Sequence, residues 1–287
     1  MVVRKPWVAG RFYPADPARC LSAVKGYLSV PERNGRLPEH PFGGIVPHAG
    51  WQYSGAICGE VVAFLSRKRQ PRTIVMTGTV HVPGVLRPAT MTMGYWETPV
   101  GMVEIDCEFA AALVGSGQVE DAPRAFEHEH SLEVPLPMVQ VAFPHAWFVP
   151  LMVPPTVSGV ELGATIAATA TSLGRDVVLL ASSDLTHYGP AYGFAPAGLG
   201  RSGLVWTKEE NDRLILEAIE KLDAESIVPL VKKRHNACGP AAIATVLSAA
   251  RSLGAKRGYI LDYKTSYDVM PEGEPTNFVG YVGAVLG

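Results

Sequence analysis

Short, uninterrupted apolar runs that alternate with longer helix-like segments most constrain the fold of this chain. Such runs are typical of strands that helices cover on both faces of a sheet. The predicted strands are 42–47, 73–78, 147–153, 176–182, 258–263 and 278–286. The predicted helices are 55–68, 106–115, 158–173, 207–221, 224–233 and 240–253. The alternation predicts an α/β protein in which the first five runs form one central sheet with helices on both faces.

Composition narrows the class of protein further. The chain has 287 residues, of which 47% are hydrophobic, and this is enough to bury a large core. No repeat or linker divides residues 1–287, so a single domain is predicted. The 25 Lys and Arg nearly balance the 27 Asp and Glu, which argues against a nucleic-acid partner. We expect a cytoplasmic protein without a membrane partner, because bilayer-length apolar segments, a signal core and CxxC pairs are all missing.

Polar side chains that can bind a metal follow three of the predicted strands. His48 follows the first strand, His81 the second, and Asp184 and His187 the fourth. Cys238 lies immediately before the last predicted helix. In open α/β sheets ligands bind beyond the carboxyl ends of the strands, so residues that follow different strands can meet in one crevice. The pattern predicts a metal site or an acid–base site at that edge.

Each of these residues also has an ordinary structural explanation. His48 is at a strand-to-helix junction and could cap the helix, and His81 alone favours neither interpretation. Asp184 could be a helix N-cap beside a surface His187. Cys238 could be a small buried hydrophobic residue, although a helix N-terminus would also stabilise its thiolate as a ligand or nucleophile.

Three polar segments are harder to interpret. The charged run 127–133 could be a solvated loop before a helix that starts near Ser131, and the pattern leaves it undecided. Pro and Gly cluster at 83–101 and 189–203, which predicts two long surface loops close to the site. The second of these, together with the preceding Tyr188, is the predicted mobile segment and a candidate lid.

Five motifs in this order carry a resemblance to a known family: VAGRFYP at 8–14, VPHAGWQYSG at 46–55, EHSLE at 129–133, SSDLTHYG at 182–189 and CGP at 238–240. Together they resemble the Memo family, whose prokaryotic members are called AmmeMemoRadiSam system protein B. That family is similar in fold to the class III extradiol ring-cleavage dioxygenases. The resemblance implies a three-layer α/β/α sandwich around a central sheet that is mostly parallel or mixed.

The resemblance also implies a set of site residues. The implied metal ligands are His48, His81 and Cys238, where the dioxygenases use two histidines and a glutamate. The implied catalytic residues are Asp184 and His187 beside the metal, and His130 on the rim. The expected cofactor is one divalent or redox ion, first of all Fe(II), with Cu or Zn as alternatives because a thiolate makes the site softer. Val82 stands where many relatives have another histidine. The resemblance therefore does not define the substrate-facing surface.

Three hypotheses about function follow. The first is a mononuclear metal-dependent oxidoreductase on an unidentified small molecule, with His187 as general base and Asp184 in support. The second is a non-catalytic binding protein for a peptide or small molecule, since Memo proteins of animals are regarded as adaptors for phosphotyrosine peptides. The third is a hydrolase that uses Cys238 as nucleophile and His187 or His48 as base. The sequence leaves the oligomeric state open.

Overall fold

Four parallel strands form the centre of the main sheet. A computed structural model describes residues 2–31 and 37–287. The strand order in the centre is β2 (Gly43–Val46), β9 (Val177–Ser182), β3 (Thr73–Gly78) and β8 (Trp147–Met152). Nearly every residue of these strands is buried, because helices cover the sheet on both sides. All four strands were predicted within two residues of their observed ends.

Antiparallel strands extend the sheet at one edge. β12 (Phe278–Leu286) runs antiparallel to β2, and β11 (Gly258–Thr265) and β10 (His187–Tyr188) both pair with β12. At the other edge lie the short strands β4 (Ala89–Thr90) and β7 (Glu120–Asp121). The sheet is therefore mixed, and all six predicted strands belong to it.

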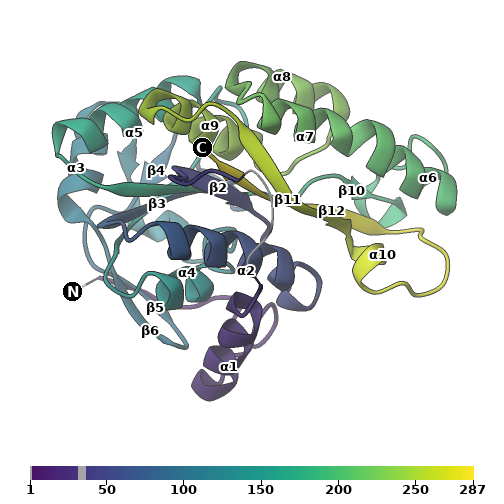
Figure 1. The fold of residues 1–287 in the computed structure, drawn as a ribbon, viewed down its shortest axis with the longest axis horizontal. Helices are drawn as coiled ribbons and strands as arrows, with labels where there is room; N and C mark the ends of the chain where they lie inside the picture. The colour runs from purple at the N-terminus through teal and green to yellow at the C-terminus, as the bar shows by residue number, and fades with distance from the viewer. Residues whose placement is uncertain (1, 32–36) are drawn as a thin grey trace.

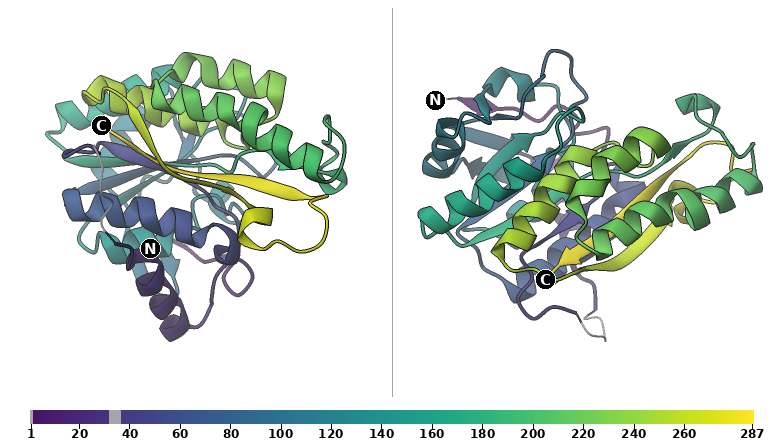
Figure 2. Two further views of the ribbon diagram at one scale, coloured as in Figure 1. Left: turned by 45° about the vertical axis from the view of Figure 1, so that its right-hand side comes forward. Right: turned by 90° about the horizontal axis from the view of Figure 1, so that it is seen from above.

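Helices cover both faces of this sheet (Figures 1 and 2). One face carries α3 (Cys107–Gly115), α5 (Val160–Ser172), α7 (Asp212–Glu220), α8 (Ala224–Arg234) and α9 (Pro240–Leu253). The other carries α1 (Pro17–Leu28), α2 (Trp51–Lys68) and α4 (Leu136–Ala142). α5 and α9 pack closely because Gly163 has no side chain: a Cβ there would lie 2.4 Å from the Thr245 carbonyl oxygen. The predicted α/β sandwich is confirmed.

The first predicted loop, 83–101, is correct only in part. It contains β4 and the strand β5 (Tyr95–Thr98), which pairs with β6 (Gly101–Glu104) and β1 (Val3–Arg4) in a small second sheet. These strands have only two to four residues each, so no apolar run marks them. One of the two partners of β5, the strand β1, lies about ninety residues away, and only the folded chain brings them together.

The second predicted loop, 189–203, is correct only in part. After the short η2 (Pro190–Tyr192), a helix begins at α6 (Arg201–Trp206) and continues through the π-helix η3 (Thr207–Asn211) into α7. The predicted helix 207–221 thus begins six residues earlier. Gly203 permits this because the ring of Tyr188 lies where a Cβ would be. Whether the segment moves as a lid stays a prediction.

Other boundaries also differ from expectation. The helix expected from Ser131 begins at Leu136, since residues 131–135 form turns. α2 begins at Trp51, four residues earlier than predicted, directly after Gly50. Neither α1 nor α10 (Ser266–Val269) was predicted. Among the described residues, no helix has both the length and the apolar character needed to cross a membrane.

Candidate metal centre

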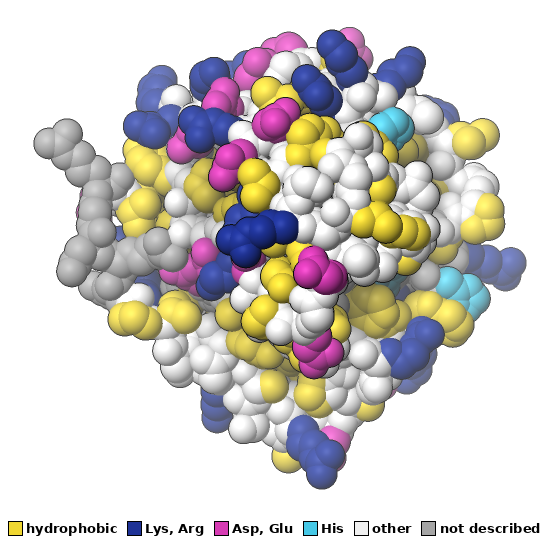
Figure 3. All heavy atoms as spheres, turned by 90° about the vertical axis from the view of Figure 1, so that its right-hand side faces the viewer, with side chains coloured by type: hydrophobic (Ala, Val, Ile, Leu, Met, Phe, Trp, Pro, Cys, Tyr) yellow, Lys and Arg dark blue, Asp and Glu magenta, His cyan; other side chains and the backbone are white. Residues whose placement is uncertain are grey.

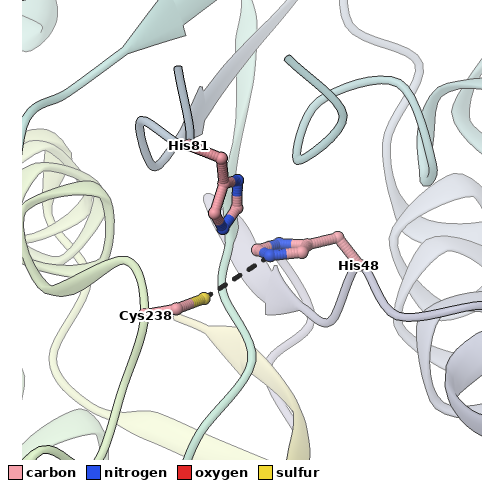
Figure 4. A group of neighbouring side chains, drawn as sticks. All are labelled: His48, His81 and Cys238. Atoms are coloured by element: carbon pink, nitrogen blue, oxygen red, sulfur yellow. Dashed lines mark hydrogen bonds between the residues drawn. The ribbon is translucent and has the colours of Figure 1, made fainter. Parts of the chain in front are cut away.

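His48 follows β2 and is fixed at both its backbone and its ring. Its backbone N–H donates to Asp184 Oδ1 at 2.8 Å, and its ring Nδ1 lies 2.9 Å from Ser182 Oγ at the end of β9. The Ser182 hydroxyl donates its only hydrogen to the Ser131 carbonyl oxygen, so it must accept from His48 Nδ1–H. Nε2 of His48 therefore keeps its lone pair, and it faces Cys238 Sγ at 3.4 Å (Figure 4).

His81 is oriented in the same manner by a carboxylate. Its Nδ1 lies 2.9 Å from Glu129 Oε1, and its backbone N–H donates to Glu129 Oε2 at 2.6 Å. Burial alone would raise the pKa of Glu129, but the hydrogen bonds from His81 and Ser131 lower it to about 2. The carboxylate thus accepts from Nδ1–H and leaves Nε2 of His81 for a metal, as in carboxylate–histidine–metal arrangements.

Cys238 lies two residues before α9, next to the loop that follows β9. The Cys238 backbone N–H donates to the Asp184 carbonyl oxygen at 3.1 Å. The Cys238 carbonyl oxygen accepts from the Thr79 hydroxyl at 2.8 Å. Burial, and then the nearby Asp184, raise the pKa of the Cys238 thiol to about 12. The expectation that the helix start lowers this pKa is therefore wrong. A bound cation would reverse the effect, because a coordinating thiol is deprotonated.

These three side chains form a group that fits a metal ion. The donor atoms of His48, His81 and Cys238 all lie within 4.8 Å of one another and point into one space (Figure 4). We call this group the cysteine triad. In each histidine Nδ1 donates to an oxygen acceptor, which leaves Nε2 as the ligand atom. His48 is buried and His81 is exposed, so the centre opens to solvent on the His81 side.

A second group of donors overlaps with the first. His81, Glu129 and His130 also have donor atoms within 4.8 Å of one another, and we call them the glutamate triad. The rings of His81 and His130 stack with centroids 4.4 Å apart, and the His48 ring is 5.6 Å from that of His130. Burial is the main cause that lowers the pKa of both His48 and His130, so neutral imidazoles are favoured here.

Asp184 and His187 lie beside these groups, in the segment that follows β9. Asp184 is buried, and burial raises its pKa while the nearby His187 opposes that change. His187 Nδ1 is 3.0 Å from the Leu185 carbonyl oxygen, which can only accept. Nδ1 therefore carries the hydrogen, and Nε2 of His187 is available as a base. The ring of Tyr192 packs edge-on against His187 at 5.1 Å.

A cavity of about 370 Å³ lies on the other side of Tyr192. Tyr53, Tyr281, Met270 and Glu274 are among its lining residues. Figure 3 shows the face of the molecule that carries α6 and α10, where hydrophobic side chains surround a hollow. The cavity is large enough for a side chain or a small molecule, and Tyr192, which lines it, separates it from His187.

Sequence reasoning missed the residues that orient the ligands. Glu129 was left in an undecided charged run, yet it is fully buried beside His81. Glu133, four residues later, is also buried: it pairs with Arg4 and accepts hydrogen bonds from Tyr13 and from the backbone of the N-terminal segment. Both acids belong to the charged run 127–133, and no local pattern distinguished them from solvated residues. Ser182 carried no signal of its own.

The protein is an α/β protein with a cluster of histidines and one cysteine at the carboxyl ends of its parallel strands. Comparisons with known proteins assign it to a family. A profile of the Memo-like proteins matches residues 4–285. The MEMO1 family protein of Methanopyrus kandleri is 35% identical over 295 residues, covering 99% of this chain and 98% of that protein. The MEMO1 family protein of Ignicoccus hospitalis is also 35% identical, covering 98% and 97%. The chain belongs to the Memo family.

Among solved structures, an uncharacterized protein from Escherichia coli K12 matches with a TM-score of 0.48 and 14% sequence identity. The match covers 80% of this chain and 92% of that one.

Proposed function

We propose that this Memo-family chain is a metal-dependent oxidoreductase acting on an unidentified small molecule. The observation that carries the proposal is the convergence of His48, His81 and Cys238. Nδ1 of each histidine is hydrogen-bonded to an oxygen, so Nε2 is free to bind a metal. Such an arrangement holds an ion while leaving room for a further ligand, and the exposed His81 side provides that room. The resemblance to extradiol dioxygenases supports redox chemistry. The unpaired state of all four cysteines supports a cytoplasmic location.

The protein's own groups have distinct tasks in this proposal. When bound, a redox ion such as Fe(II) supplies Lewis acidity and electrons at its open positions. Asp184 ties the His48 and Cys238 backbones together, so it keeps two ligands at a fixed separation. Nε2 of His187 takes the proton of a substrate hydroxyl, a step that typically contributes ~10²–10⁴-fold in rate. His130 forms the wall next to the ligands.

Fe(II) is the first choice for the ion, with Cu or Zn as alternatives. Two imidazoles and one thiolate are softer than two imidazoles and one carboxylate, which favours Zn or Cu(I). Because the Cys238 thiol has a pKa of about 12, the metal must displace its proton, and binding should strengthen as the pH rises.

A non-catalytic binding function is the second candidate. The cavity beside Tyr192 favours it, because tyrosine rings and Glu274 line a space that could hold a peptide side chain. The hydrolase hypothesis has less support, since a thiol with a pKa of about 12 is protonated at neutral pH and is a poor nucleophile.

Metal analysis tests the proposal. Protein purified without a chelating tag should contain one ion per chain, and His48→Ala, His81→Ala and Cys238→Ala should each lose it with an unchanged far-UV circular dichroism spectrum. Cys107→Ala and His128→Ala are matched controls, because both residues are exposed and lie outside either triad. His187→Ala should keep the ion and lose substrate oxidation. Full metal content in the triple ligand variant would contradict the proposal.

A further inference from the structure

The cysteine triad and the glutamate triad share one residue, His81, and differ in the chemistry of their third donor. The first offers a thiolate, which suits Zn and Cu(I). The second offers two imidazoles and a carboxylate, the donor set typical of non-haem Fe(II) sites. The centre therefore contains a soft donor set and a harder one side by side.

Glu129 has the chemistry of a ligand as well as that of an orienting residue. It is fully buried, and its two oxygens face His81 and the backbone of Ser131. Its Oε1 accepts from His81 Nδ1 and Ser131 N, whereas its Oε2 accepts only from the His81 backbone. A carboxylate oxygen can accept two bonds, so Oε2 keeps capacity for a cation.

His130 is the third member of the glutamate triad. Within the described part of the chain neither of its ring nitrogens is in a hydrogen bond, and its closest polar contact is Nδ1 to Glu129 Oε1 at 3.9 Å. The ring is largely buried and is held by stacking against His81 and by Phe12 at 5.2 Å. Its ring nitrogens are therefore not committed to a protein partner and are free to bind an ion.

We propose that His81, His130 and Glu129 form a second metal position, which takes a hard divalent ion such as Mn(II), while the cysteine triad takes the softer ions Fe(II), Zn(II) or Cu(I). The two positions are alternatives because both need His81. A metal in the second position takes Nδ1 in place of the proton that Nδ1 donates to Glu129, and the ring proton then lies on Nε2, the atom that the cysteine triad needs. The choice between them is made by the softness of the ion. This inference rests on the proposed function only in making His81 a metal ligand.

Parallel titrations of the full chain with Mn(II) and with Zn(II) test the inference. His130→Ala should weaken Mn(II) binding more than ~100-fold, beyond the ~10–100-fold typical of a residue that only orients a ligand. The same variant should leave Zn(II) affinity within a few-fold. Cys238→Ser should do the reverse, and His81→Ala should abolish both. In the unaltered protein Zn(II) should displace Mn(II) one for one.

Two further variants separate ligation from orientation. Glu129→Gln keeps the size and a hydrogen-bond acceptor, so it should lose Mn(II) far more than Zn(II). Glu127→Gln and His128→Ala, which change exposed neighbours in the same segment, should alter neither metal. His130→Gln serves if the alanine variant does not fold, as judged by circular dichroism.

Several results would overturn the second position. Mn(II) affinity that survives His130→Ala and His130→Gln would show that His130 is not a ligand. Equal loss of both metals in Glu129→Gln would leave Glu129 as an orienting residue only, and loss of Mn(II) in Cys238→Ser would show a single position. In each case Zn(II) binding at the cysteine triad would still support the metal site on which the proposed function depends. Failure of the unaltered protein to bind Zn(II), Mn(II), Fe(II) or Cu(I) would overturn both.

Discussion

Two buried carboxylates lie behind different parts of the candidate metal centre, and their charges are stabilised in different ways. Glu133 stands behind the glutamate triad and forms an ion pair with Arg4, whose guanidinium also lies over the Trp96 ring. Asp212 stands behind the segment of Asp184 and His187, and it accepts hydrogen bonds from Thr186 and Tyr263. Within the described residues no cation pairs with Asp212, and burial raises its pKa to about 6.

The difference shows how each side of the site is assembled. The Asp212 side joins the start of α7 to Tyr263 of β11 and to Thr186, between β9 and β10, through hydrogen bonds from hydroxyl and backbone groups. The Glu133 side is built from a turn that is clamped by the N-terminal segment, more than a hundred residues away in sequence. Closing so long a loop costs entropy, and a buried ion pair with several hydrogen bonds offsets that cost.

Breaking the Arg4–Glu133 pair should have the largest effect. Arg4→Met leaves the buried Glu133 carboxylate without its cation, and the free energy of unfolding should fall by about 3–5 kcal/mol. Urea denaturation followed by circular dichroism measures this loss. The double variant Arg4→Met with Glu133→Leu should recover part of it, and a single variant within 1 kcal/mol of the unaltered protein would show that the pair does not hold this side.

Asp212 should make stability depend on pH in the opposite sense to a paired carboxylate. Its pKa is raised from 3.8 to about 6, so the folded state binds the proton more tightly than the unfolded state. The stabilising contribution is complete below pH 4 and is lost as the pH rises through 6. By pH 7 the cost is on the order of 2–3 kcal/mol.

Asp212→Asn removes this group and keeps its size, so the variant should lose that part of the pH dependence and gain stability at pH 7 relative to pH 4. Thermal unfolding at several pH values provides the measurement. An Asn variant with the same pH profile as the unaltered protein would mean that Asp212 does not titrate in this range.

Ser182→Ala should weaken metal binding without unfolding the chain. The substitution removes the oxygen that orients His48 through Nδ1, and loss of such an outer partner typically costs ~10–100-fold in metal affinity. Competition with a chelator of known affinity measures the change. Ser183→Ala is an informative comparison, because Ser183 contacts Cys238 Sγ but not His48; an equal loss of affinity in both would point to a general loosening of the loop.

The smallest effect should come from an ion pair at the surface. Arg213 and Glu217 are one helical turn apart on α7 and both are exposed. Glu217→Gln should therefore change the free energy of unfolding by less than about 0.5 kcal/mol, since solvent screens exposed pairs. A loss comparable to that of Arg4→Met would contradict the view that burial, and not pairing alone, makes the Arg4–Glu133 contact strong.

The central sheet could be read from the sequence because its strands are buried on both faces and therefore consist of continuous apolar residues. The same rule placed His48, His81, Asp184 and His187 at one edge, since residues that follow parallel strands end on the same side. The segments whose structure differs from the sequence-based expectation are fixed by contacts that are not local in sequence. The strands of the second sheet are too short to show a pattern, and the turn at 131–135 is fixed by contacts of buried Glu129 and Glu133.

The sequence by itself determined the order of the elements, the apolar core and the family motifs, because these depend on local composition and spacing. Only the tertiary structure decided which polar groups are buried together. It placed Glu129 against His81, turned His48 so that Nε2 faces Cys238, and brought His130 onto the His81 ring. These outcomes depend on contacts between residues 48 to 190 positions apart, for which no local pattern of side chains exists.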